Sequence, residues 1–91
     1  MTVRFSSHAL NKIRKELSKL GITEELVKEI LNRPELKFYD SATDRYIAVN
    51  MNFKVAVIYE EKNKNIFVIT VIYSSKMMQI IEKRKRIGRW I

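Results

Sequence analysis

Cysteine is absent from this 91-residue chain, and glycine occurs only at positions 21 and 88. Without cysteine, the chain has no disulfide, no thiolate nucleophile and no zinc–thiolate site, and this composition fits a reducing compartment. Two isolated glycines exclude a phosphate-cradling loop and a dinucleotide fingerprint, so nucleotide-dependent enzymes are excluded as well. The sequence therefore predicts a cytoplasmic protein that works without a cofactor.

Long hydrophobic runs are also missing. The longest, Ile66 to Tyr73, is far shorter than the roughly 20 residues that a membrane-spanning helix needs. The first residues contain no apolar leader, so we expect neither secretion nor contact with a membrane. One proline and a hydrophobic fraction of 46% favour a folded chain. At this length, residues 1–91 are expected to form a single domain.

Metal-ligating side chains are sparse. Histidine occurs once, at position 8, so the chain has no cluster of histidine and cysteine ligands for zinc. A site made only of carboxylates is conceivable, but the acids near the expected turns show no recognisable spacing: Asp40, Asp44, Glu60 and Glu61. We therefore predict no metal site.

Two segments at the start of the chain have helical periodicity. The first contains Leu10, Ile13, Leu17 and Leu20, with Ser6 or Ser7 as its cap and Gly21 at its end. The second begins after the cap Thr23 and ends before Pro34.

Beyond Pro34 the hydrophobic period changes to two. Short connections separate four expected strands: Leu36 to Asp40, Arg45 to Asn50, Phe53 to Glu60 and Ile66 to Tyr73. A stripe of Met77, Ile80, Ile81 and Ile87 then predicts a C-terminal helix that covers the second face of the sheet. The expected fold is α+β, with two N-terminal helices on a four-stranded antiparallel sheet and a basic terminal helix.

The positive charge is concentrated at the end of the chain. Residues 76–91 contain a single acid, Glu82, and carry +5 of the net charge of +8. Lysine and arginine bind phosphates through counterion release, and an indole offers a base a surface for stacking. The expected nucleic-acid-binding residues are Lys76, Lys83, Arg84, Lys85, Arg86, Arg89 and Trp90. Alternatively, Trp90 and Ile91 fold back as a hydrophobic lock and the cations form a solvated face.

Three polar residues are candidates for catalysis. His8 projects away from the leucine stripe of the first helix, Arg45 opens a strand, and Thr70 interrupts the apolar last strand. Imidazole, guanidinium and hydroxyl groups are the parts needed for metal-free RNA cleavage, as base, phosphate clamp and supporting donor. Each also has an ordinary interpretation, as a surface histidine, an edge cation and a β-forming residue.

The chain resembles domain of unknown function family 4258, on fragments spread over nearly its whole length: Phe5-Ser6-Ser7-His8-Ala9, Gly21-Ile22-Thr23, Pro34, Arg45-Tyr46, Ile69-Thr70-Val71 and Gly88-Arg89-Trp90. That family is similar in layout to the RelE-like toxins of the barnase, colicin and RelE superfamily, which are mostly metal-independent ribonucleases. The resemblance implies that His8, Arg45 and Thr70 occupy the polar positions of the family pattern. It also implies an acidic, antitoxin-like partner protein for the basic face.

Three functions therefore remain open. The first is an RNA-directed, toxin-like endoribonuclease, and the second is a nucleic-acid-binding module without catalysis. The third is a protein–protein adaptor or homodimer that uses Met77 and Met78 on the terminal helix, since methionine adapts to varied partners.

Overall fold

The computed structural model describes residues 2–91 of the chain. In chain order the elements are β1 (Thr2–Phe5), α1 (Ser7–Lys15), η1 (Leu17–Leu20), α2 (Glu24–Asn32), β2 (Leu36–Asp40), β3 (Arg45–Asn50), β4 (Val55–Lys62), β5 (Asn65–Tyr73) and α3 (Met77–Arg86). A first strand precedes the helices α1 and α2, the strands β2 to β5 then follow one another, and α3 comes last. A short 3₁₀ helix, η1, follows the first α-helix. None of the helices in this part of the chain is long and apolar enough to cross a membrane.

The sheet is five-stranded and mixed, with the strand order β1-β5-β4-β3-β2. The α+β class is as expected, but the expectation of four antiparallel strands is wrong. An additional strand, β1, precedes the helices and pairs in parallel with β5, from Thr2 opposite Asn65 to Phe5 opposite Val68. Strand β5 is therefore interior to the sheet, flanked by β1 and β4.

The helices begin at the expected caps. The Ser6 hydroxyl accepts a hydrogen bond from the Ala9 amide, and the Thr23 hydroxyl accepts one from the Leu26 amide. The first helical segment is less regular than expected, because its α-helix stops at Lys15 and the chain continues as η1. Gly21 ends η1 at φ +80°, a left-handed conformation that glycine adopts without steric cost.

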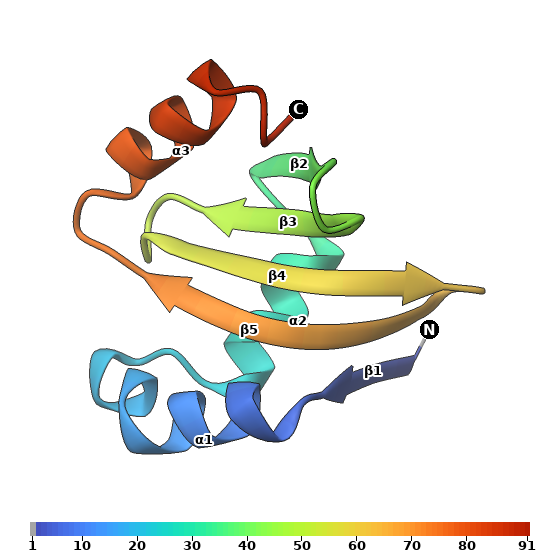
Figure 1. Cartoon of the computed structure of the whole chain (residues 1–91). Coiled ribbons are helices and arrows are strands. Elements are labelled where there is room, and N and C mark those ends of the chain that lie inside the picture. The colour runs from blue at the N-terminus through green and yellow to red at the C-terminus, as the bar shows by residue number, and fades with distance from the viewer. Residues whose placement is uncertain (1) are drawn as a thin grey trace.

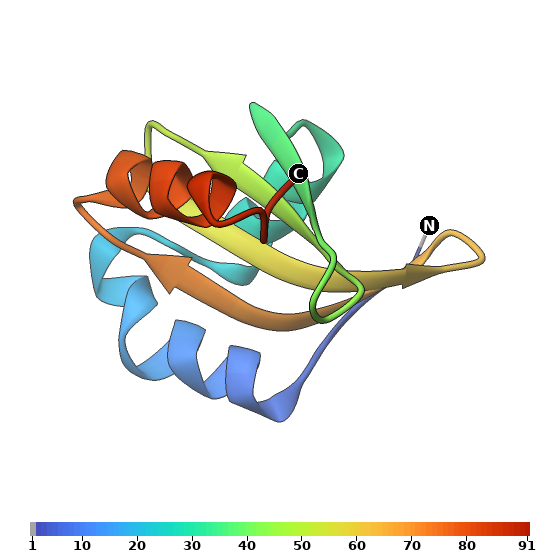
Figure 2. The same cartoon turned by 45° about the horizontal axis from the view of Figure 1, so that its top comes forward.

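Helices cover both faces of the sheet (Figures 1 and 2). Helices α1 and α2 pack on one face, and α3 lies on the other. The first face carries the larger core, which includes Ala9, Ile13, Val27, Val57 and Val68. On the second face, Met77 and Ile81 of α3 pack over the sheet in a smaller core with Ile47, Val49, Ala56 and Trp90. The terminal helix thus covers the second face, as its apolar stripe predicts.

The boundaries of the last two strands differ slightly from those expected. Strands β2 and β3 have the expected limits, whereas β4 is displaced by two residues toward the C-terminus. The connection from β4 to β5 shortens to Asn63 and Lys64, both with left-handed φ angles of 52° and 67°. Such a pair forms a tight turn whose twist suits antiparallel strands, so both strands extend further than their apolar residues indicate.

Candidate nucleic-acid-binding and catalytic face

A bulge in β5 fixes the start of α1. Ile58 pairs with Thr70 and Tyr59 pairs with Val68, so Ile69 has no partner on β4. The Ser6 hydroxyl donates to the Ile69 carbonyl at 2.7 Å, and the Ser6 amide donates to the Val68 carbonyl at 2.9 Å. Ser6 therefore caps α1 and joins its first turn to the bulge.

This junction brings two of the three catalytic candidates together. His8 lies in the first turn of α1, and its Nε2 atom is 3.1 Å from Oγ1 of Thr70. The histidine is exposed and the threonine is half-buried. Because Thr70 pairs with Ile58, which packs against the α3-side core, the contact lies on that side of the sheet. The imidazole is thus held at one nitrogen while its ring remains accessible.

Arg45 lies on the same side of the sheet but does not join the pair. Its Nε atom is 3.5 Å from a carboxylate oxygen of Glu60, the facing residue on β4, and is buried without a hydrogen-bond partner among the described residues. Strand β4 lies between Arg45 on β3 and Thr70 on β5, so the two backbones are about 10 Å apart or more. The guanidinium is therefore engaged by an acid rather than turned to His8.

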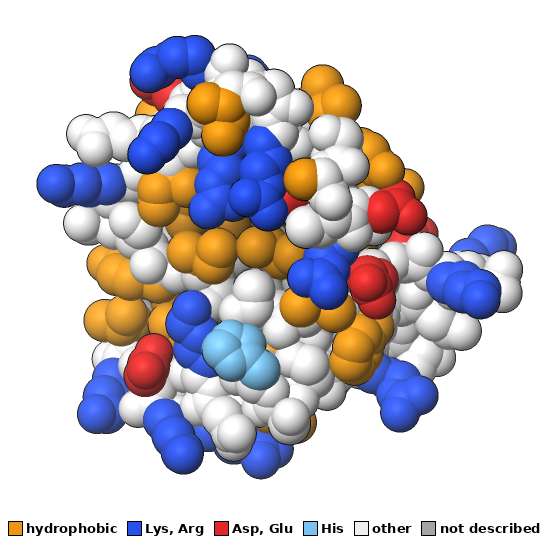
Figure 3. Space-filling view, viewed as in Figure 1, with side chains coloured by type: hydrophobic (Ala, Val, Ile, Leu, Met, Phe, Trp, Pro, Cys, Tyr) orange, Lys and Arg blue, Asp and Glu red, His pale blue; other side chains and the backbone are white. Residues whose placement is uncertain are grey.

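We use the name open sheet face for the surface between α1 and α3 to which Ile58, Phe67, Thr70 and Ile72 contribute. Ile58 and Ile72 are half-buried and pack against the second core. Figure 3 shows the single histidine below a strip of hydrophobic side chains, with Lys and Arg side chains above the strip. This face therefore combines apolar and cationic groups with the imidazole.

Two cations of α3 lie at the upper border of the open sheet face. Lys83 and Arg84 line a hollow of about 230 Å³ together with Ile72, Ile80 and Ile87. Ile72 follows Thr70 by two residues on the same side of β5, a separation of about 7 Å. The hollow is therefore next to the His8–Thr70 pair.

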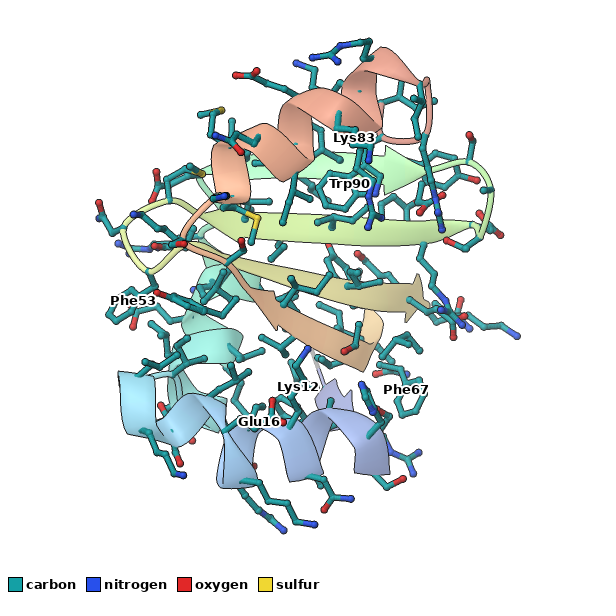
Figure 4. All side chains as sticks on the ribbon, turned by 60° about the vertical axis from the view of Figure 1, so that its left-hand side comes forward. Lys12, Glu16, Phe53, Phe67, Lys83 and Trp90 are labelled. Carbon is teal, nitrogen blue, oxygen red and sulfur yellow. The ribbon has the colours of Figure 1, made fainter. Side chains whose placement is uncertain are left out.

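Lys12 lies at the lower border. It is half-buried, and Figure 4 shows it extending from α1 toward β5, while Lys83 lies on α3 near Trp90. Lys12 follows His8 by one helical turn, and both residues line a shallow hollow on α1. Cations from two helices thus border the open sheet face.

Trp90 is not available to a base. Its side chain is 1% exposed, stacks on Phe38 with ring centroids 5.7 Å apart, and lies under the Arg84 guanidinium. The backbone on either side pairs with β2, because Tyr39 and Ile91 exchange amide–carbonyl hydrogen bonds of 3.0 and 2.9 Å. The structure therefore corrects the expectation of an open indole and matches the alternative of a folded-back tail, although Ile91 itself is exposed.

Arg89 is engaged as well. Its Nε atom donates to Asp40 at 3.0 Å, and the other carboxylate oxygen accepts from the amides of Ala42 and Thr43. Burial alone would raise the pKa of Asp40, but the hydrogen bonds from Ala42 and Arg89 outweigh it and hold the pKa below its ordinary value. Arg89 thus joins the C-terminal tail to the end of β2.

The remaining cations of α3 are more available. Among the described residues, Lys76, Lys83, Lys85 and Arg86 form no salt bridge, and all four are exposed. Lys85 lies over the Phe38 ring at 5.9 Å.

Only one of the two methionines of the adaptor hypothesis is available to a partner, because Met77 is buried in the core and Met78 is exposed. Within residues 2–91, no three histidine, aspartate or glutamate side chains group closely enough to hold a metal ion.

Sequence reasoning missed Phe67 and Lys12 on the open sheet face. Phe67 is 40% exposed on an interior strand, although its place in an apolar run favours burial. Lys12 lies one helical turn after His8, a spacing that is visible in the sequence.

Comparisons with known protein families, with curated proteins and with solved structures give no match to this chain.

Proposed function

We propose that this protein binds single-stranded RNA along the open sheet face and cleaves it without a metal ion. The observation that carries the proposal is the 3.1 Å contact between His8 and Thr70 on a surface bordered by Lys12 and Lys83. A histidine oriented by a hydroxyl and open to solvent suits a general base. Cations on both borders suit a polyanion that crosses the pair.

The chemistry uses groups of the RNA itself. His8 accepts the proton of a ribose 2′-hydroxyl, the 2′ oxygen attacks the adjacent phosphorus, and the 5′ oxygen leaves with a proton taken from solvent. The products are a 2′,3′-cyclic phosphate and a 5′-hydroxyl. In this scheme Nε2–H of His8 donates to the Thr70 hydroxyl, which leaves Nδ1 as the base, and the hydroxyl donates its own proton to a non-bridging oxygen. Arg45 clamps the phosphate after the RNA draws its guanidinium away from Glu60.

The test is cleavage of a fluorescent single-stranded RNA in the presence of a chelator. Purified protein is expected to yield fragments that end in a cyclic phosphate, and His8→Ala is expected to lose cleavage while still binding the RNA. Thr70→Val keeps the shape of the side chain and is expected to slow cleavage about 10-fold or more. Lys28→Ala on α2 is the control and should cleave normally. Absence of cleavage from roughly pH 6 to roughly pH 9, or full cleavage by His8→Ala, contradicts the proposal.

A binding module without catalysis is the second candidate. The observation that favours it is the Arg45–Glu60 ion pair, which leaves the expected phosphate clamp occupied in the free protein. In that case His8→Ala and Thr70→Val change neither affinity nor RNA integrity, whereas reversing the charge of Lys83 or Arg86 weakens binding at low salt. Cleavage by the unmodified protein decides between the two candidates.

The resemblance to toxin-like ribonucleases adds a proposed partner. An acidic protein that covers Lys83 and Arg86 would block access to the open sheet face, because its carboxylates would pair with the cations that the RNA phosphates would otherwise contact. Such a partner is expected to inhibit cleavage in proportion to complex formed, with loss of inhibition at high salt. The oligomeric state of the free protein, monomer or homodimer, follows from its light-scattering mass.

A further inference from the structure

Phe67 is exposed where its neighbours in the strand are buried. It lies in the interior strand β5, between β1 and β4, and is 40% exposed. Ile66 and Val68 point to the α1 and α2 side and belong to the larger core. Phe67 points to the other side, in register with Arg4 and Glu60. Its ring is therefore an accessible aromatic surface on the open sheet face.

Polar and cationic groups surround this ring. A hollow of about 470 Å³ lies against Phe67, and Arg4, Lys62 and Asn65 contribute to its wall. Glu60 also lines it, but the two cations Arg4 and Lys62 outnumber this single carboxylate in the hollow. An aromatic surface flanked by two cations complements a base attached to an anionic backbone.

The ring is close to the proposed catalytic pair. Phe67 precedes Thr70 by three residues on the same side of β5, which places them at most about 10 Å apart along the strand. A nucleotide whose base rests on Phe67 therefore extends its sugar and phosphate over the neighbouring part of β5. In that direction lie Thr70 and His8, with Lys83 beyond them on α3.

We propose that Phe67 is the stacking platform for an unpaired RNA base and that it sets which phosphate reaches His8. This inference rests on the proposed function and gives a physical reason for its single-stranded substrate, because a base held inside a duplex cannot lie flat on the ring. It also replaces Trp90 as the aromatic contact with RNA. Arg4 and Lys62 hold the backbone beside that nucleotide.

The test measures RNA affinity in protein that also carries His8→Ala, so that the RNA stays intact. Phe67→Ala is expected to weaken binding of a single-stranded RNA by about fivefold to about 100-fold, and Phe67→Tyr to preserve it. Phe53 is the matched control because it is 41% exposed, and it lies at the other end of the sheet in the turn between β3 and β4. Phe53→Ala is expected to change affinity by less than about twofold.

A spectroscopic variant tests stacking directly. Phe67→Trp places an indole on the open sheet face, while Trp90 stays buried and supplies a constant background. Single-stranded RNA is expected to quench the added fluorescence, and an oligonucleotide without bases is expected to leave it unchanged. Quenching also reports on stacking should Phe67→Ala fail to fold.

The outcomes separate this inference from the function on which it rests. If the parent protein binds and cleaves RNA but Phe67→Ala binds equally well and Phe67→Trp is not quenched, the platform is overturned and the proposed function stands. If the parent protein binds no RNA at all, both are overturned. Equal quenching by the oligonucleotide without bases also overturns stacking.

Discussion

The Ser6 hydroxyl donates a 2.7 Å hydrogen bond to the carbonyl of Ile69, the residue that the bulge leaves unpaired in β5. The same hydroxyl accepts from the Ala9 amide at 3.0 Å and so caps α1. One side chain therefore determines where α1 begins and how its first turn meets β5. The position of His8 over Thr70 depends on this junction.

Ser6→Ala is expected to lower the free energy of unfolding by about 1–2 kcal/mol, because the cap of α1 and the bond to Ile69 are lost together. Denaturant unfolding measures the loss. Ser7→Ala is the matched control, since Ser7 is exposed and should change stability by less than about 0.5 kcal/mol. Cleavage by Ser6→Ala should also fall, and unchanged cleavage would show that the junction does not position His8.

Trp90→Ala is expected to cost about 3–5 kcal/mol, because a fully buried indole is removed from its stack on Phe38. Trp90→Phe should cost much less, since the buried indole N–H has no hydrogen-bond partner among the described residues. Ile91→Ala, at a side chain that is 72% exposed, serves as the control. RNA affinity should be the same for Trp90→Phe and the unmodified protein, and a large loss of affinity at equal stability would return Trp90 to the RNA-binding surface.

Asp40 makes the free energy of unfolding depend on pH in the acid range. Its pKa in the folded protein lies below the ordinary value of 3.8, so the unfolded chain takes up this proton first as the pH falls. Its contribution is therefore complete above the ordinary value and disappears as the pH falls through the folded-state pKa. At neutral pH, Asp40→Asn is expected to destabilise the protein by about 1–3 kcal/mol.

Urea unfolding of the unmodified protein and of Asp40→Asn checks the sign of this effect. The difference between their free energies of unfolding should shrink as the pH falls below about 4. Glu61→Gln, at an exposed position, provides the control. A difference that is constant down to about pH 2 means that Asp40 contributes through shape rather than charge.

Glu60→Gln is expected to strengthen RNA binding by up to about fivefold, because it removes the carboxylate that engages Arg45 at 3.5 Å. Glu61→Gln removes the same charge from the next residue of β4, which points to the opposite side of the sheet, and is the matched control. Equal gains from both variants indicate a general charge effect, and Arg45 is then not a phosphate clamp.

The positive charges of α3 are expected to determine how strongly RNA affinity depends on salt concentration. Lys83→Glu and Arg86→Glu should each weaken RNA binding at low salt and lower the slope of log affinity against log salt by about 1. Titrations from about 50 mM to about 200 mM salt measure this slope. Lys28→Glu lies on α2, which covers the opposite face of the sheet, and should leave the slope unchanged.

The local features of the fold follow closely from the sequence. The sequence predicts a cap at Ser6 or Ser7, a cap at Thr23, the left-handed Gly21 and the limits of β2 and β3, because neighbouring residues determine each of these features. It does not predict the parallel strand β1, because four residues carry too weak a period to stand out and their partners begin at Asn65. Long-range pairing of this kind leaves little trace in a single sequence.

In the candidate site, too, features set by neighbouring residues are predictable from the sequence, and features set by distant segments are not. Helical projection correctly places His8 away from the core, since that depends only on its own helix. Its contact with Thr70 depends on the bulge at Ile69, which sets the side of β5 that carries each following residue. The burial of Trp90 depends on Phe38 and β2, some fifty residues earlier in the chain. These outcomes arise from packing between distant segments.

Chemical-shift mapping of isotope-labelled His8→Ala protein with single-stranded RNA tests most directly whether RNA binds along the open sheet face. The residues with perturbed chemical shifts are expected to cluster on the open sheet face, at Phe67, Thr70 and Ile72, and at Lys12 and Lys83 on its two borders. Perturbations confined to α2 and the turn around Phe53, or none at all at low salt, would contradict RNA binding along this face.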